Sequence, residues 1–473
     1  MDTGTPFASA LERAAHHAKV FLEGLDEIPV SAQVTYEELI KRLNRPLVDA
    51  GVEPATIIDD LAADVDGGLT ISSSGRFFAW VIGGNLPSAL AADWLTSAWD
   101  QNAGMFAVAP AAAVAEEVAG EWLKELLGLP KTASFAMVTG CQMAHFTCLA
   151  VARHALLAKH GWDVEKQGLA GSPPIRILTN DQYHATFELA VRYAGLGTDA
   201  LVTVESNADG TMVPEALEKV LAESDGPTIV QLQAGDLNTG AYDAFEALIP
   251  LAHQHDAWVH VDGAFGLWCA ASPMYRHLLK GVKHADSWAA DGHKWLNVPF
   301  DSGYAFIAHP EPHSASMSIR ASYLIHASEA RDQVDWNPEW SRRGRGFPTY
   351  AAIRELGRDG VRDLIDRCNG HAHALVTRLG QLPNVEVASE PIINQGMVRF
   401  LDPKPGATDE DHDAFTDQVI ASVTAEGEAF FGGVTWRGMR CMRVSVSSWL
   451  TNERDIDRTV AAVKRHLGAA STA

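Results

Sequence analysis

The sequence is poor in cysteine and in basic residues, and each shortage excludes a class of protein. Its five cysteines, an odd number spread from Cys141 to Cys441, argue against a disulfide framework, and they form no Cys-x-x-Cys pair of a zinc knuckle. We therefore expect a reducing compartment and no metal site. Lysine and arginine number 37 against 60 aspartates and glutamates, which gives a net charge of −23. That charge opposes nonspecific binding to nucleic acid or to an anionic membrane.

Long apolar runs are also missing. The longest apolar stretch, residues 105–115, contains Pro110 and is too short to span a bilayer. The amino terminus lacks a basic segment followed by an apolar one. Instead, apolar residues recur at helical spacing from Phe7 to Leu25, which predicts a packing helix rather than a targeting peptide. With 47% apolar residues the chain is expected to be globular, and we expect it to be cytoplasmic.

Strand and helix patterns alternate through the middle of the chain. Short apolar segments rich in β-branched residues predict strands, and helical patterns such as residues 214–222 separate several of them. This alternation predicts an α/β fold with a mostly parallel central sheet covered by helices. Helices are also predicted over residues 36–43 and 143–158. The predicted strands are residues 175–178, 201–204, 228–232, 258–261, 287–290, 304–308, 397–401 and 442–447.

Three parts are predicted along the chain. Residues 1–76 read as a helical segment, and residues 77–350 as a large α/β domain. Glycines and a proline between Gly344 and Pro348 mark a boundary, after which residues 351–473 read as a smaller carboxyl-terminal α+β domain.

An aspartate and a lysine stand at the ends of two predicted strands. Asp262 ends the apolar run 258–261, and Lys294 follows residues 287–290 within His293-Lys294-Trp295. Parallel sheets bind ligands at the carboxyl ends of their strands. A lone lysine beside a tryptophan is usually a surface residue resting its stem on the ring. The pair, however, is the equipment for holding pyridoxal phosphate (PLP): the lysine forms an imine with its aldehyde, and the aspartate keeps the pyridine nitrogen protonated.

A tight turn formed by Gly140, Cys141 and Gln142 precedes the long helix pattern. The turn has two interpretations: an ordinary helix start capped by Thr139, or a phosphate site built from free N–H groups at the positive end of the helix dipole. If Asp262 and Lys294 hold PLP, its phosphate needs an anchor nearby, which favours the second interpretation.

Other candidates each allow a functional and a structural interpretation. His184, after the strand 175–178, either stacks on a flat cofactor ring or caps a helix. Tyr323 either delivers a proton to a carbanion or is an ordinary surface tyrosine. Arg443 either binds a substrate carboxylate or faces water on an edge strand. Trp80 and Phe106 line a substrate pocket, or else pack in the core or against a second subunit.

With these residues in view, the chain resembles the PLP-dependent group II amino-acid decarboxylases, which include aromatic-L-amino-acid, glutamate, tyrosine and histidine decarboxylases. The similarity runs from about Phe77 to the end, and Asp262 with His293-Lys294-Trp295 is its most specific part. The resemblance implies the aspartate-aminotransferase-like fold type I of PLP-dependent transferases. It also implies an obligate homodimer with active sites at the interface, in which residues 1–76 serve dimerisation. Further matching segments are residues 85–93, 122–130, 261–264, 341–343 and 442–443.

The resemblance implies a role for most of the candidates. Lys294 would be the Schiff-base lysine, Asp262 would pair with the pyridinium nitrogen, and Tyr323 would protonate the substrate carbon from the catalytic loop. The remaining cofactor contacts would be Ala264 below the ring, His184 above it, and Gly140, Cys141, Gln142 and His293 around the phosphate.

Several positions depart from the family pattern. Cys141-Gln142-Met143 stands where small residues, a serine or threonine, and glutamate are common, and His145 stands where asparagine or threonine is usual. Asp236 replaces a common threonine near the cofactor, where it could alter ring contacts or the preferred charge of the substrate. These departures concern the substrate more than the cofactor.

The expected reaction is PLP-dependent decarboxylation of a small-molecule L-amino acid to its amine and carbon dioxide, through an external aldimine and a quinonoid. Three alternatives stay open. They are an aminotransferase, which would release a keto acid, an aldehyde-forming decarboxylase variant, and a catalytically silent PLP-binding dimer. The sequence does not identify the side chain of the substrate.

Overall fold

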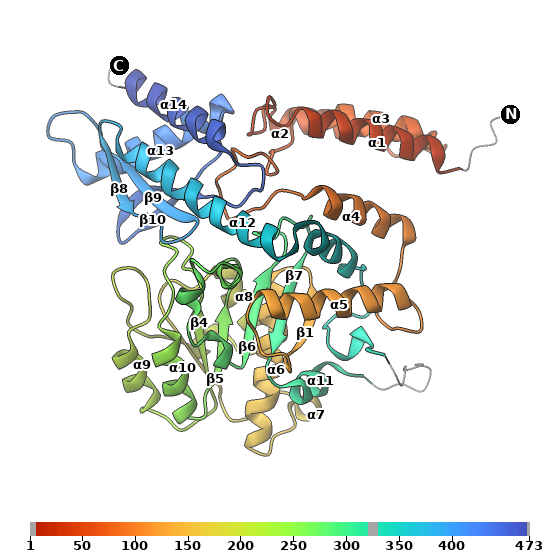
Figure 1. The fold of residues 1–473 in the computed structure, drawn as a ribbon, viewed down its shortest axis with the longest axis vertical. Helices are drawn as coiled ribbons and strands as arrows, with labels where there is room; N and C mark the ends of the chain where they lie inside the picture. The colour runs from red at the N-terminus through yellow and green to blue at the C-terminus, as the bar shows by residue number, and fades with distance from the viewer. Residues whose placement is uncertain (1–5, 320–329, 471–473) are drawn as a thin grey trace.

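The structure, a computed structural model, describes residues 6–319 and 330–470. Its centre is a seven-stranded sheet with the order β1-β7-β6-β5-β4-β2-β3 (Figure 1). Strands β2 to β6 pair in parallel, and β7 runs antiparallel to both β1 and β6. The strands are β1 (Ser134–Val138), β2 (Arg176–Thr179), β3 (Leu201–Thr203), β4 (Thr228–Gln233), β5 (Trp258–Asp262), β6 (Ser287–Asp291) and β7 (Gly303–Ile307). The predicted mostly parallel sheet is confirmed, with β1 as the strand that the sequence analysis missed.

Helices cover both faces of this sheet. One apolar cluster joins the sheet to α5 (Pro110–Leu126), α9 (Pro214–Leu221), α10 (Phe245–Gln254) and α12 (Gly346–Gly380). A second cluster joins the opposite face to α6 (Cys141–Lys159) and α8 (Ala185–Tyr193). Because both faces are covered, β4, β5 and β6 are buried at every position.

A smaller carboxyl-terminal unit holds a four-stranded antiparallel sheet with the order β10-β11-β9-β8. Its elements are β8 (Val385–Ser389), β9 (Gln395–Phe400), α13 (Asp409–Glu426), β10 (Gly432–Trp436), β11 (Met439–Ser445) and α14 (Glu453–Ala470). The predicted boundary at residue 350 falls inside α12, which runs on past a non-helical residue, Gly357 with φ 61°. The division into three domains stays a prediction.

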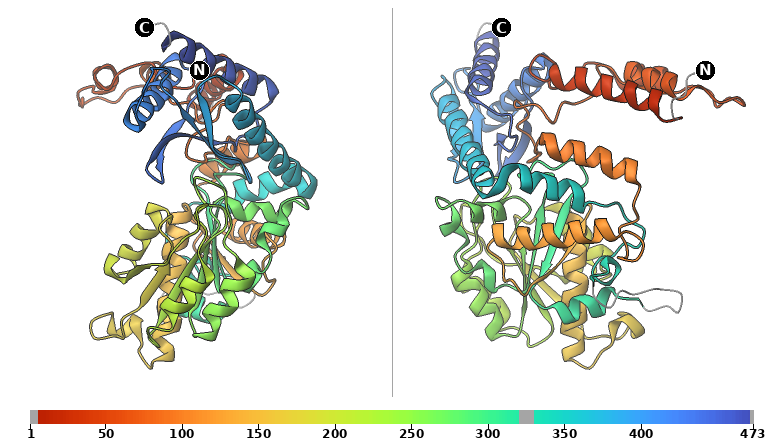
Figure 2. Two further views of the ribbon diagram at one scale, coloured as in Figure 1. Left: turned by 90° about the vertical axis from the view of Figure 1, so that its left-hand side faces the viewer. Right: turned by 45° about the vertical axis from the view of Figure 1, so that its right-hand side comes forward.

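The amino-terminal helices α1 (Ala8–Glu23), α2 (Tyr36–Leu43) and α3 (Pro54–Asp64) have no buried residue. They extend beside the carboxyl-terminal unit and away from the large sheet (Figure 2). Thr35 and Glu38 cap α2 reciprocally, so the helix has its own start signal. The next helix, α4 (Pro87–Trp99), lies between them and the sheet.

Proline occupies the first turn of α3, α4, α5, α9 and α11, where its missing N–H costs no helical hydrogen bond. Within the described ranges, no helix is long and apolar enough to cross a membrane. The short elements are α7 (Val164–Gln167), α11 (Pro310–Met317), and the 3-10 helices Thr198–Ala200, Gly266–Ala271, Arg276–Leu279, Val282–His284 and Gln333–Asp335.

Candidate active site

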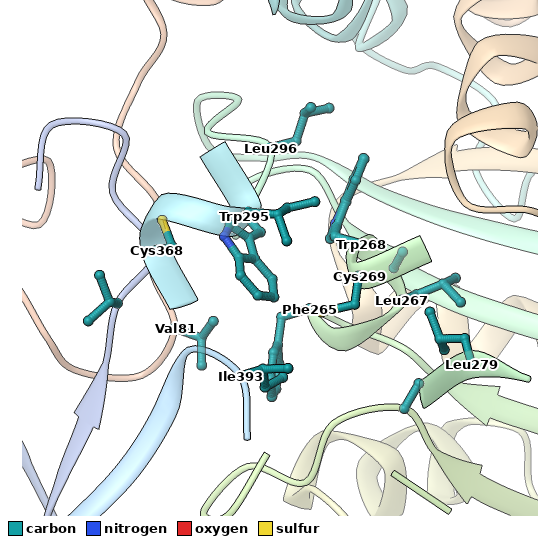
Figure 3. Packing of buried hydrophobic residues seen from close by; sticks show 14 of the residues in the cluster. Val81, Phe265, Leu267, Trp268, Cys269, Leu279, Trp295, Leu296, Cys368 and Ile393 are labelled. Atoms are coloured by element: carbon teal, nitrogen blue, oxygen red, sulfur yellow. The ribbon is translucent and has the colours of Figure 1, made fainter. Parts of the chain in front are cut away.

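Lys294 follows β6 in a turn at the carboxyl edge of the sheet, beside the end of β5. Its Nζ lies 3.1 Å from Oδ2 of Asp291, the last residue of β6. The next residue, Trp295, is buried in the core near Phe265, Cys368 and Ile393, and this packing anchors the turn (Figure 3).

The segment before α4 passes directly over this turn. A Cβ atom on Gly83 would lie 1.9 Å from the carbonyl oxygen of Lys294, so only glycine fits there. Burial alone would lower the pKa of Lys294, but the nearby carboxylates of Asp291 and Asp262 outweigh it and the pKa is raised.

Asp262 is a buried carboxylate at the end of β5. Its Oδ1 accepts the N–H of Ala264 at 3.1 Å, and its Oδ2 lies 3.4 Å from Nε2 of His145. Burial would raise its pKa, but His145, Lys294 and the Ala264 N–H hold the pKa far below the usual range of a carboxyl group. Asp262 is therefore an anion at every pH at which the protein is expected to work.

The amino terminus of α6 opens beside the Lys294 turn. Gly140 is the residue before the helix and no side chain caps it, so the alternative with Thr139 as the cap is not what the structure has. The N–H of Cys141 donates to Oδ1 of Asp291 at 2.6 Å. The N–H groups of Gln142 and Met143 belong to the first turn, where no carbonyl of the helix can accept them.

His293 closes the other side of this opening. A Cβ atom on Gly140 would lie 3.0 Å from Cε1 of His293, so the ring packs against the turn. The ring stacks on Phe300 at 4.4 Å, and its Nδ1 accepts the N–H of Ser302 at 3.2 Å. Burial lowers the pKa of His293, which favours the neutral ring.

His184 caps a helix, which is one of the two roles considered for it. Its Nδ1 accepts the N–H of Thr186 at 3.2 Å and so caps α8. Its side chain is exposed, yet its pKa is lowered, first by partial loss of water and then by Lys294. The cap therefore holds an open imidazole close to Lys294 and Asp262.

Asp236 and Arg443 are two buried charges near this edge of the sheet. Oδ1 of Asp236 accepts the N–H groups of Asn238 and Thr239 at 2.8 Å each, which shapes the turn after β4, while Oδ2 has no hydrogen bond to any residue that the structure describes. Arg443 on β11 is 6% exposed, and its Nε has no hydrogen-bond partner among residues 6–319 and 330–470. Burial lowers the pKa of Arg443 to about 10, and Asp236 partly offsets this. The interpretation of Arg443 as an edge-strand residue facing water is therefore wrong: β11 lies between β10 and β9, and the side chain is buried.

The remaining candidates are dispersed. Trp80 is largely exposed and packs its ring against Phe77 and Phe430. Phe106 donates its N–H to Oδ1 of Asp332 at 2.9 Å. Tyr323 lies outside the described residues.

Two groups of the site, Asp291 and His145, were not among the predicted site residues. Asp291 contacts Lys294, His293 and the start of α6, although its place three residues before the lysine was a usable signal. His145 was noticed only as a departure, not as a neighbour of Asp262.

Although no metal site was expected, Cys141, His145 and Asp262 offer three ligand atoms within 4.8 Å of one another. Burial raises the pKa of the Cys141 thiol well above its usual range, which disfavours the thiolate that a metal would bind.

These groups fit PLP. A lysine amine, an aspartate anion and free helix N–H groups surround one edge of the sheet, which is the donor set that the cofactor requires. Ala264 lies between the aspartate and the lysine turn, because its N–H donates to Asp262 and its carbonyl accepts the N–H of Asp291.

Comparison with known proteins agrees with this fit. Residues 37–401 match the family model described as the pyridoxal-dependent decarboxylase conserved domain. Phenylacetaldehyde synthase of Petunia hybrida is 24% identical over 94% of this chain and 91% of its own length. Aromatic-L-amino-acid decarboxylase of Bacillus atrophaeus is 26% identical over 85% of this chain and 83% of its own. Among solved structures, Oryza sativa TDC with PLP and tryptamine has a TM-score of 0.92 at 23% identity, covering 99% of both chains. Mouse CSAD has a TM-score of 0.89 at 22% identity, covering 98% of both.

Proposed function

Because the chain belongs to the pyridoxal-dependent decarboxylase family and is a PLP-dependent carboxy-lyase, we propose that it removes the α-carboxyl group of an L-amino acid and releases the amine. The observation that carries this proposal is the placement of Lys294 close enough to Asp262 for their charges to interact, at the carboxyl edge of the sheet and beside the open amino terminus of α6. When bound, PLP supplies an electron sink for the pair that the departing carboxyl group leaves behind.

In this proposal several residues of the chain each make one contact with PLP. Lys294 holds it covalently, and Asp262 contacts the pyridine nitrogen. Since the pKa of Asp262 is strongly lowered, it remains an anion that keeps a proton on a nitrogen beside it. The other proposed contacts are Ala264 and His184 on the two faces of the ring, Asp236 near it, and Gly140, Cys141, Gln142 and His293 at the phosphate.

Arg443 is the proposed partner of the substrate carboxylate. A buried guanidinium whose Nε has no partner lacks the hydrogen bonds that such a group requires, and a carboxylate supplies two in parallel. Trp80 and Phe106 are proposed as apolar contacts of the substrate side chain, whose identity stays open.

Tyr323 is proposed to donate the proton that completes amine formation. An aldehyde-forming reaction is the second candidate, because relatives include phenylacetaldehyde synthases of Petunia hybrida and a Rosa hybrid cultivar. A phenol that protonates the α-carbon quickly leaves oxygen no time to react there. Tyr323→Phe keeps the ring and removes the proton donor, so this variant should evolve carbon dioxide while amine gives way to aldehyde and ammonia. Amine production at the parental rate would show that Tyr323 is structural, and aldehyde from the parent would favour the second candidate.

A homodimer is proposed from the surface of the amino-terminal helices. Leu11 is 60% exposed and Leu61 is 50% exposed, although α1 and α3 carry apolar residues at helical spacing. Exposed apolar area of this kind is typical of a protein interface. Location in the cytoplasm stays a prediction.

The deciding experiment measures carbon dioxide release by the purified holoprotein with each common L-amino acid. Borohydride reduction followed by peptide mapping should place the pyridoxyl group on Lys294. Keto acid without carbon dioxide would show an aminotransferase. Absence of turnover with every amino acid would leave the silent PLP-binding dimer.

A further inference from the structure

Behind Asp262, on the α6 side of the sheet, two histidines form a buried chain of contacts. Nε2 of His145 lies 3.4 Å from Oδ2 of Asp262, and its Nδ1 lies 2.8 Å from Nε2 of His260. Nδ1 of His260 in turn lies 3.0 Å from Oγ of Ser287, which accepts the indole N–H of Trp258 at 2.9 Å. Both histidines are 0% exposed.

Packing fixes the orientation of both rings. Phe187 of α8 meets His145 edge to face at 5.5 Å and stacks on His260 at 6.0 Å. The two imidazoles are themselves nearly perpendicular, with an interplanar angle of 87°. Neither ring can therefore swing away from its partner without disturbing the core on this face of the sheet.

The contacts restrict the position of the protons. Burial, and to a smaller extent the neighbouring His145, lowers the pKa of His260 to about 3. His260 is therefore neutral and carries one ring proton. When Ser287 donates to Nδ1 of His260, the proton of His260 is on Nε2 and points at Nδ1 of His145. His145 then carries its own proton on Nε2, facing Asp262.

The opposite order of donors has a different consequence. If His260 donates to Ser287, His145 donates to His260 from Nδ1. A neutral His145 would then turn a lone pair toward the Asp262 carboxylate, and two acceptors 3.4 Å apart repel each other. This order therefore requires a His145 cation. In both permitted states an N–H of His145 faces Oδ2 of Asp262.

We propose that His145 is a positioning residue that acts through Asp262. In this proposal His260 and Ser287 ensure that Nε2 of His145 carries the N–H that faces Asp262. The N–H of Ala264 donates to one oxygen of Asp262, and Nε2 of His145 lies 3.4 Å from the other, so the carboxylate stays ionised and aimed along one direction. This inference rests on the proposed function, in which Asp262 contacts the pyridine nitrogen of PLP. The other titratable groups near Asp262 are Lys294, Cys141 and His184.

The test compares substitutions at His145 in the purified holoprotein. His145→Leu removes the donor, whereas His145→Gln keeps an N–H near the Nε2 position and loses the link to His260. His154→Leu is the matched control, because His154 lies on the same helix and pairs with Glu165 away from the site. The readouts are the dissociation constant for PLP and the 15N NMR shift of PLP labelled at its pyridine nitrogen.

His145→Leu should weaken PLP binding about ten- to a hundredfold, the cost of leaving a buried charged group without one of its polar contacts. It should also move the 15N signal toward that of the deprotonated pyridine. His145→Gln should restore most of both values, and His154→Leu should match the parent. Unchanged affinity and 15N shift in His145→Leu would overturn the inference, as would stoichiometric zinc in the parent that is lost with His145.

Asp262→Asn in the same assay separates this inference from the proposed function. If Asp262→Asn shifts the 15N signal and His145→Leu does not, only the proposed role of His145 is wrong. If neither variant shifts the signal, the proposed role of Asp262 fails. If His145→Leu does not fold, His145→Gln and His260→Gln decide. The inference requires that the 15N signal of His145→Gln be close to the parental one and that the signal of His260→Gln be shifted. Equal signals in these two variants would contradict the inference.

Discussion

Strands β4, β5 and β6 are buried at every position, whereas helices α1, α2 and α3 have no buried residue. Both regions carry apolar residues at the spacing of their element, so the difference does not come from the pattern. The strands find cover within the chain, since α6 and α8 lie on one face and α5, α9, α10 and α12 on the other. The comparison shows that the chain covers its own sheet, whereas the described residues leave the amino-terminal helices without cover. A second copy is the cover that the proposed homodimer would supply.

Lys294→Ala should have the strongest effect, and it acts at the covered sheet. The variant should keep its fold, because Trp295 and the strands, not the amine, hold the turn in place. It should lose turnover on the order of 10⁴-fold or more, as removal of a covalent catalyst does. Carbon dioxide release and circular dichroism measure the two properties, with exposed Lys283→Ala as the control. A variant with substantial turnover would contradict the assignment.

Leu11→Glu combined with Leu61→Glu tests the other side of the comparison. Charges here should separate the subunits, because obligate interfaces are rich in apolar residues and bury about 2,000 Å² or more in total. Light scattering should report a monomer, and activity should fall at least about tenfold if the sites need both chains. Exposed Glu12→Gln on the same helix is the control. A double variant that stays dimeric, or an active parental monomer, would break the comparison.

Arg443→Lys should have a smaller effect than either, confined to the substrate. Lysine keeps the charge but loses the planar pair of donors, so KM should rise about tenfold while kcat changes less. Arg440→Lys is matched, because Arg440 lies on the same strand and pairs instead with Asp417 at 2.7 Å. Equal kinetics for Arg443→Lys and the parent would remove Arg443 from the site.

His253→Gln should have the smallest effect, at the edge of the sheet opposite the site. His253 and His309 both contact Asp286, at 3.0 and 2.8 Å, and the hydrogen bond to Asp286 raises the pKa of His253. The contact between His253 and Asp286 therefore contributes stability below pH 6.5, and this stability is lost as the pH rises through the raised pKa of His253. The parent should unfold at a temperature no more than about 2 °C above that of the variant at pH 5.5, with a smaller gap at pH 8.5. A gap that widens with pH would contradict this sign.

Much of the fold was predictable from local pattern. All eight predicted strands are present, and the helix predicted over residues 143–158 is α6, Cys141–Lys159. Strand β1 was missed because it leads almost directly into the turn of Gly140, Cys141 and Gln142, which was the only feature predicted just before α6. Strands β8 and β10, which are only partly buried, were also missed.

The residues that end β5 and follow β6 could be read from the chain, because a strand pattern indicates where its own carboxyl end lies. The local pattern was therefore enough to place Asp262 and Lys294 at one edge of the sheet. Which distant groups meet them depends on how the elements pack. Asp291 meets the N–H of Cys141, and His145 meets His260, only because the sheet and α6 pack together. Such contacts join residues more than a hundred positions apart, and strand order, which sets them, has no local signal in the chain.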